Sequence, residues 1–297
     1  MNKGFEKGLF VEPRKNKGGT MIKKILLVLD GSPAGAAARE YALRLSKATN
    51  AGMTAIGVLD TPWITAAQPE PIGGAAFKLQ RDEAMIEHSQ EQVVHLLEDF
   101  AHEAKVHGIN VEAVEAEGFP ATEIERLSHE HDLIVIGKTT DFHFDLDEDS
   151  DMTVRHVARD NPRPLMIIPE NPAKGGKILV ALDNSLQSSR ALHMFLLLGL
   201  AMGDEVEVLS IHEDEELATI IAERGVRMCG LYGVKASARP IHAAGNRGEL
   251  ILSAAKDVQA NMLVMGGFSH SFFRELFFGS CTKKLMAGAK IPVFLHH

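Results

Sequence analysis

Short, continuous apolar runs alternate along this chain with longer segments whose apolar residues recur at helical spacing. Continuous runs of this kind are typical of parallel strands that helices cover on both faces. The apolar runs predict strands at 25–29, 53–59, 111–115, 133–136 and 165–168. Between them the spacing predicts a helix with Ala36, Ala37, Tyr41, Leu45 and Ala48 on one face, then helices at 77–107, 121–130 and 153–160.

The same order of motifs then occurs a second time. The segment 24–32 recurs as 177–185, 118–124 as 245–251, 132–137 as 261–266, and 163–168 as 291–295. Four pairs of similar segments in the same order indicate two copies of one unit, joined near 169–176. We therefore predict domains at 21–170 and 176–297, with a shorter helix at 215–232 in place of the long one. Residues 1–20 are rich in Gly and Lys without a period, and we interpret them as a disordered leader or tag.

Composition and missing motifs exclude several classes of protein. The net charge of −9 argues against a general nucleic-acid binder, and no apolar run approaches the ~20 residues of a membrane span. The two cysteines, Cys229 and Cys281, lie far apart in sequence, which fits a reducing cytoplasm better than a disulfide framework. Without a His-Glu-x-x-His, a paired Cys-x-x-Cys or a P-loop, we expect no metal site and no catalytic residues.

The stretch from Gly266 to Ser280 has the chemistry of a phosphate cradle. Glycines follow the apolar run 262–265, and Gly279 with Ser280 opens a predicted helix. Ligands of open parallel sheets bind beyond the carboxyl ends of the strands, and a helix start presents free N–H groups to an anion. The stretch holds no catalytic group, so it predicts binding rather than reaction.

These motifs together resemble the universal stress protein family in its two-domain form. The resemblance rests on the tandem repeat, the Asp after the first strand of each copy, Gly118-Phe119-Pro120, and the pattern Gly-Gly-Phe-Ser-His-Ser-x-x-Arg-Glu-x-x-x-Gly-Ser, over about 21–297. It implies two tandem flavodoxin-like (adenine-nucleotide alpha-hydrolase-like) domains, each a five-stranded parallel sheet with helices on both faces. It also implies ATP as the ligand, with or without Mg²⁺, homodimers, and a protein partner that the sequence does not identify.

The resemblance assigns an adenine-nucleotide site to the second copy. Asp183 would contact the ribose or adenine, Ala181 precedes it, and Ile211 would form the adenine wall; Gly266, Gly279, Ser280 and the Cys281 backbone would hold the phosphates. Ser269 stands where the family has its second glycine, and its hydroxyl could donate to a phosphate oxygen.

In the first copy the family's Gly-Ser pair falls at Asp151-Met152. Because a carboxylate there would repel phosphate, we expect no ATP in the first domain.

Three functions remain open at this point. The first is a stress-response regulatory protein that binds ATP or a related adenine nucleotide in its second domain without substantial catalysis. The second is a scaffold that binds no nucleotide and acts through dimerisation and partner docking, which Ser269 and the altered loop of the first copy favour. The third is a slow ATP hydrolase, for which Asp183 is the one nominee. Asp30 and Asp183 could instead simply cap the helices that follow them.

Overall fold

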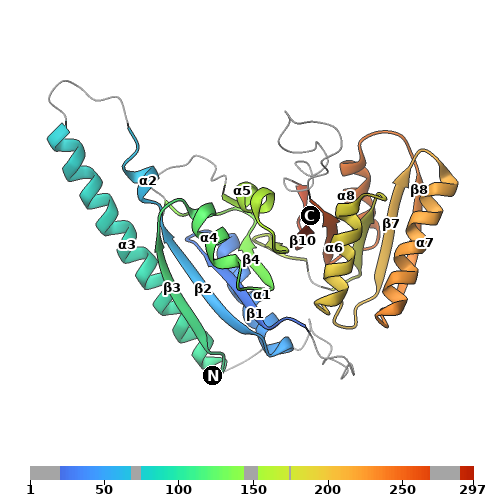
Figure 1. Cartoon of the computed structure of the whole chain (residues 1–297), viewed down its shortest axis with the longest axis horizontal. Coiled ribbons are helices and arrows are strands. Elements are labelled where there is room, and N and C mark those ends of the chain that lie inside the picture. The colour runs from blue at the N-terminus through green and yellow to red at the C-terminus, as the bar shows by residue number, and fades with distance from the viewer. Residues whose placement is uncertain (1–20, 68–74, 144–152, 174, 268–287) are drawn as a thin grey trace. The chain divides into compact units, whose positions relative to one another are not determined.

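The computed structural model describes residues 21–67, 75–143, 153–173, 175–267 and 288–297. The chain from Ile22 to Asn171 forms one compact unit and the chain from Pro172 to His297 forms another (Figure 1). Each unit is an α/β sandwich built on a parallel sheet, as the apolar runs predict.

The first unit alternates strands and helices in sequence order. Its elements are β1 (Lys24–Leu29), α1 (Pro33–Thr49), β2 (Gly52–Leu59), α2 (Thr61–Ile64), α3 (Ala75–Val106), β3 (Val111–Glu117), α4 (Pro120–Ser128), β4 (Leu133–Gly137), α5 (Thr153–Asp160) and β5 (Leu165–Ile168). The strands are parallel and lie in the order β3-β2-β1-β4-β5. In β1 and β4 nearly every residue is buried, because helices cover both faces of the sheet.

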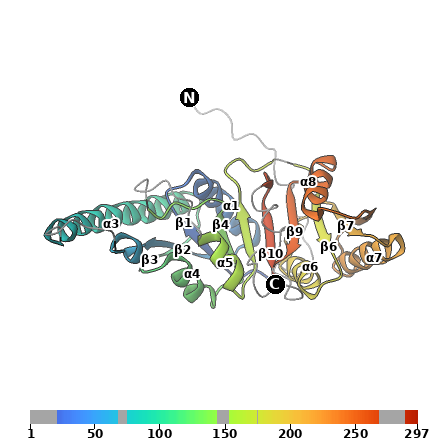
Figure 2. The same ribbon diagram turned by 90° about the horizontal axis from the view of Figure 1, so that it is seen from above.

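The strand order fixes which helices lie on which face. From β1 the chain moves outward to β2 and β3, then crosses back past β1 to β4 and β5. Because each crossover is right-handed, the helices that connect strands in the first direction and those that connect strands in the second lie on opposite faces of the sheet. Accordingly α1 packs on β1 and β4, α3 packs on β2 and β3, and α4 packs beside α5. Figure 2 shows α4 and α5 on the side of the sheet opposite α3.

The second unit repeats this order. Its elements are β6 (Ile178–Leu182), α6 (Leu186–Leu197), β7 (Val206–His212), α7 (Glu215–Leu231), β8 (Ala236–His242), α8 (Arg247–Asp257), β9 (Met262–Gly266) and β10 (Val293–His296). The strands lie in the order β10-β9-β6-β7-β8, so β6 takes the place of β1 and β9 that of β4. Figure 2 shows α8 on the opposite side of this sheet from α6 and α7.

Two local predictions need correction. The buried stripe of α1 runs through Ala34, Ala38, Ala42 and Leu45. The face that the sequence predicts includes Ala36, which is exposed in the structure. The turn α2 was not predicted; Asp60 caps it, since its side chain accepts a hydrogen bond from the Trp63 backbone N–H at 3.1 Å. The long helix is as predicted within two residues at each end, and Val93, Leu97 and Phe100 are buried on its inner face.

Candidate functional site at the carboxyl edge of the second sheet

The predicted nucleotide site lies where the strand order of the second sheet reverses, between β6 and β9. Such a reversal opens a crevice beyond the carboxyl ends of the two strands. Leu182 pairs with Ser210, so the next residues, Asp183 and Ile211, lie level with each other. Ala181 pairs with Met265, so Gly266 lies level with Leu182. The register therefore brings the four predicted residues Ala181, Asp183, Ile211 and Gly266 to one edge.

Asp183 presents an exposed carboxylate at this edge. Its Oδ1 accepts a hydrogen bond from the Ser185 backbone N–H at 3.1 Å, in the turn that leads into α6. Partial desolvation raises the pKa of Asp183, but the Ser185 and Ser188 hydroxyls, the Ser185 N–H and the positive charge of Arg247 outweigh it and leave the pKa below its usual value. The side chain is therefore an ionised hydrogen-bond acceptor at neutral pH.

The neighbours of Asp183 differ in what they offer a ligand. Ala181 is half-buried, and Ile211 is only 6% exposed at the end of β7. Arg224 donates a hydrogen bond to the Asn184 side chain at 2.8 Å, which holds a guanidinium beside the turn.

Gly266 has a structural reason to be glycine. A Cβ there would lie 2.5 Å from the backbone N of Ser188 and 2.6 Å from the backbone C of Gln187. Gly137, at the end of β4 in the first unit, is packed in the same way, since a Cβ there would lie 2.8 Å from the Gly35 backbone N. The glycine at this position therefore allows the strand end to touch the first turn of a helix in both units.

The predicted phosphate contacts Ser269, Gly279, Ser280 and Cys281 lie outside the residues that the structure describes, as do Asp151 and Met152 of the first copy. Their roles stay predictions.

The corresponding aspartate of the first unit has a different position. Asp30 is only 3% exposed, and its Oδ1 accepts a hydrogen bond from the Ser32 backbone N–H at 2.7 Å. A Cβ on Gly35 would lie 2.3 Å from that oxygen, so this position of the carboxylate requires glycine at 35. The repeat aligns Gly35 with Ser188, whose hydroxyl oxygen accepts a hydrogen bond from the Asp183 backbone N–H at 3.4 Å. Asp183, by contrast, is exposed.

The chain itself covers the crevice of the first unit. The Gly31 backbone N–H donates to the Asp141 carbonyl at 3.1 Å, and the Ser32 hydroxyl donates to the Thr139 carbonyl at 2.8 Å. Phe142, on the same loop, is 2% exposed. The loop after β4 thus lies across the end of β1, where a ligand of the first unit would bind.

Comparison with known proteins identifies the fold family. The sequence profile described as "Universal stress protein family" matches residues 21–142 and 175–297. The chain belongs to the universal stress protein family. It has the tandem, two-domain form, because the profile matches once in each half.

Members of the family with the same tandem length match nearly end to end. A universal stress protein of Synechocystis is 22% identical over 285 residues, which cover 92% of this chain and 99% of that protein. A solved universal stress protein from Archaeoglobus fulgidus superposes with a TM-score of 0.70 at 18% identity, over 93% of this chain and 98% of that one. A putative universal stress protein from Pseudomonas aeruginosa superposes with a TM-score of 0.57 at 18% identity, over 93% of each chain. These likenesses establish the fold.

The two arginines near Asp183 were not predicted from the sequence. The charges of Arg224 and Arg247 come from α7 and from the start of α8, so no spacing connects them with Asp183. The difference between Gly35 and Ser188 is visible in the aligned repeats, but the contact of Gly35 with the Asp30 carboxylate is visible only in the structure.

Two further findings bear on the class of protein. Within the described ranges, no group of three His, Cys, Asp or Glu side chains is placed to hold a metal ion. None of the helices in the part of the chain that the structure describes is long and apolar enough to cross a membrane.

Proposed function

We propose that this universal stress protein is a stress-response regulator that binds ATP, or a related adenine nucleotide, in its second domain. The observation that carries the proposal is the contrast between two equivalent aspartates. Asp183 offers an exposed, ionised carboxylate at the crevice, whereas Asp30 is buried beneath its own loop. A carboxylate at this position suits the hydroxyl groups of a ribose, which are hydrogen-bond donors.

The surroundings of Asp183 support the same ligand. Ile211 supplies an apolar wall for a flat base, and Ala181 leaves room beside the base because its side chain is small and half-exposed. Arg247 contributes positive charge near the crevice, which favours an anionic ligand. With the crevice of the first unit covered, the proposal predicts one nucleotide per chain.

The same residues argue against substantial catalysis. Hydrolysis needs a base near the terminal phosphate, and an effective base has a pKa close to the working pH. The pKa of Asp183 is instead below its usual value, and its Oδ1 already accepts a hydrogen bond from Ser185. Asp183 is therefore better suited to holding a ligand than to taking a proton from water.

Isothermal titration calorimetry with ATP and Mg²⁺ tests the proposal. Asp183→Ala removes a hydrogen bond to a charged group, which is worth about 1.5–3 kcal/mol, so the affinity is expected to fall by roughly 10- to 150-fold. Asp30→Ala, the matched change in the first domain, is expected to leave affinity and stoichiometry unchanged. Equal losses for the two variants would refute the assignment of the site to the second domain.

A second function is favoured by one observation. Because Gly266 is required by packing in the same way as Gly137, its presence does not by itself indicate a ligand. Absence of any binding of ATP by the parent protein would favour a scaffold that acts through homodimerisation and docking of a partner protein, in the cytoplasm. Analytical ultracentrifugation with and without ATP distinguishes a constitutive dimer from one that depends on the nucleotide.

A further inference from the structure

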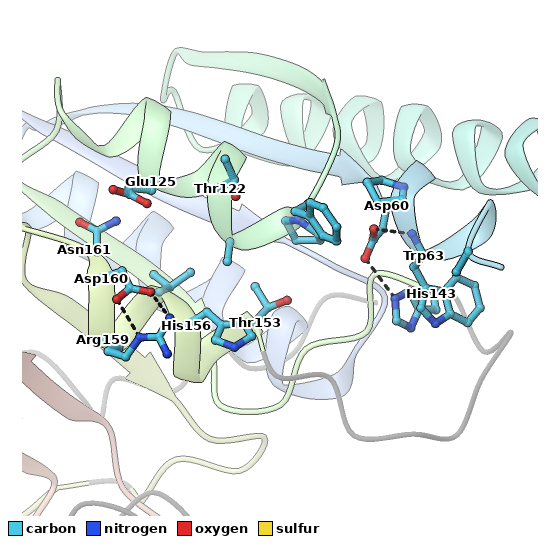
Figure 3. A pocket seen from close by; sticks show the side chains of 16 residues that line it. Asp60, Trp63, Thr122, Glu125, His143, Thr153, His156, Arg159, Asp160 and Asn161 are labelled. Carbon is cyan, nitrogen blue, oxygen red and sulfur yellow. Dashed lines mark hydrogen bonds and ion pairs between the residues drawn. The ribbon is translucent and has the colours of Figure 1, made fainter. Parts of the chain in front are cut away.

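A second pocket, separate from the proposed nucleotide site, lies in the first domain. Its volume is about 710 Å³, within the ~300–1,000 Å³ range of small-molecule sites. It is lined by residues of α2, the first half of α4, α5 and the loop after β4 (Figure 3). Val28, Asp30, Val58 and Gly137, the first-unit counterparts of four described nucleotide-site residues, do not line it; Thr153, the counterpart of Cys281, does. We call it the α4–α5 pocket.

One end of the α4–α5 pocket is aromatic and held in place. The rings of Trp63 and His143 stack with centroids 3.8 Å apart and planes 12° from parallel. Asp60 holds both residues in place. Its Oδ2 lies 3.3 Å from the His143 Nε2, and its Oδ1 accepts a hydrogen bond from the Trp63 backbone N–H. Phe119, at the start of α4, also lines the pocket and is 62% exposed. Flat aromatic surfaces of this kind suit a flat ring in a ligand.

The other end of the pocket holds a buried donor without an acceptor. Asn161 is 1% exposed, and its Oδ1 accepts the Arg163 backbone N–H at 2.9 Å. Its Nδ2 has no hydrogen-bond partner among the described residues. Figure 3 shows Asn161 at the opposite end of the pocket from Trp63 and His143, with its amide nitrogen toward the other lining residues. A buried unpaired N–H is costly, and a ligand acceptor would satisfy it.

The charges around the pocket select against anions. Arg159 is the one Arg or Lys among the described lining residues, and it is paired with Asp160 at 2.5 Å. Asp60 and Glu125 add two further carboxylates. A phosphate or carboxylate in the pocket would therefore face three negative groups and one guanidinium that is already paired. An uncharged ligand avoids this repulsion.

We propose that the α4–α5 pocket binds a small, uncharged heteroaromatic molecule. Its ring lies against the aromatic side chains of Trp63, His143 and Phe119, and an oxygen acceptor on a substituent of the ring, such as the ribose of a nucleoside, lies toward the amide of Asn161 at the other end. This site differs from the proposed nucleotide site in its domain and in the charge that it accepts, and Thr153 is the one described lining residue whose counterpart, Cys281, is assigned to that site, so the proposal stands whether or not the second domain binds ATP.

Trp63 is the only tryptophan in the chain, so intrinsic tryptophan fluorescence reports on this pocket. The titration uses guanosine, adenosine and uridine, each paired with its monophosphate, in the Asp183→Ala background so that the second domain contributes little. At least one nucleoside is expected to change the Trp63 emission in a saturable way, and its monophosphate to bind at least about tenfold more weakly. No saturable change with any nucleoside, or tighter binding of the monophosphates, would overturn the proposal.

Two variants test the assigned contacts. Asn161→Asp keeps the acceptor for Arg163 and removes the amide donor, so nucleoside affinity is expected to fall about tenfold. Phe119→Ala alters an exposed side chain that the fold does not need, and is expected to weaken binding severalfold with an unchanged unfolding midpoint. Unchanged affinity in both variants would show that the fluorescence change arises elsewhere.

Discussion

Replacing Gly266 by alanine should damage the second domain through packing. The new Cβ would lie 2.5 Å from the Ser188 backbone N, 2.6 Å from the Gln187 C and 2.8 Å from the Ser188 Cα. All three atoms are backbone, so no side-chain rotation relieves the contact. The first turn of α6 must move by about 1 Å to restore an ordinary separation.

The structure gives the size of this effect. Inserting a methyl group into a packed contact costs about 1–3 kcal/mol, and the movement also strains the cap in which Ser185 Oγ accepts the Ser188 N–H at 3.1 Å, worth about 1 kcal/mol. We therefore expect Gly266→Ala to lower the free energy of unfolding by about 2–4 kcal/mol. Gly137→Ala, whose nearest contact is 2.8 Å, should cost about 1–3 kcal/mol in the first domain.

Urea unfolding followed by far-UV circular dichroism measures both losses, and hydrogen–deuterium exchange assigns each to its domain. Gly230→Ala is the matched control: its Cβ would meet nothing within 4 Å, so the helix α7 should gain up to about 1 kcal/mol. If Gly266→Ala weakened ATP binding while its unfolding midpoint stayed that of the parent, the packing argument would be wrong. Gly266 would then serve the ligand alone.

Three more predictions concern single residues. Gly35→Ser should push the Asp30 carboxylate from the Ser32 N–H and lower the stability of the first domain by about 1–2 kcal/mol, read from Trp63 fluorescence in urea; an unchanged midpoint would contradict it. Burial lowers the pKa of His131 below 6.5, so the unfolded chain takes up a proton first as the pH falls; first-domain stability should decline in acid from about pH 6.5, and His131→Gln should abolish that slope. Burial raises the pKa of the Cys229 thiol from 9.0 to about 11, so its iodoacetamide labelling near neutral pH, followed by peptide mass spectrometry, should be at least roughly a hundredfold slower in the native than in the unfolded protein.

The sheets were predictable because their strands are buried on both faces. In β4 and β9 almost every residue is apolar and buried, so the run of side chains identifies the strand without any periodicity. The inner face of α3 was predictable for a related reason: Val93, Leu97 and Phe100 are large apolar residues among polar ones. The order of the strands is set by the fold, and handedness then fixes the face on which each helix lies.

The inner face of α1 was not predictable by the same reasoning. Its first half is rich in alanine, which contrasts little with its neighbours, so several faces fit the pattern equally well. The structure selects the one through Ala34, Ala38 and Ala42, whose small side chains let the helix approach the sheet. The turn α2 has only four residues, too few for a helical period, and its signals are the cap from Asp60 and Pro62 in its first turn.

The two candidate sites could be predicted to different degrees. The carboxyl-edge residues of the second domain follow from strand ends, which sequence defines well, and the register brings Asp183, Ile211 and Gly266 together. The α4–α5 pocket is assembled from distant segments that include Trp63, His143 and Asn161, so only the fold brings them together.

The two domains differ in the exposure of one equivalent aspartate, which is buried in the first domain and exposed in the second. Asp30 and Asp183 follow equivalent strands, and each accepts a hydrogen bond from the backbone N–H two residues on. The helix that follows differs at one position, where Gly35 in the first domain leaves room for the carboxylate and Ser188 stands at the equivalent place in the second.

A ligand should therefore act on the two domains unequally. A molecule present at 100 times its dissociation constant stabilises the state that binds it by about 2.7 kcal/mol. Under the proposed function only the unit from Pro172 to His297 would gain this energy from ATP, since in the unit from Ile22 to Asn171 a loop of the chain already covers the equivalent crevice. Hydrogen exchange with and without ATP would then slow in the second unit alone. Equal slowing in both would mean that the first-unit loop opens for nucleotide, and that its hydrogen bonds to Gly31 and Ser32 form a gate rather than a permanent cover.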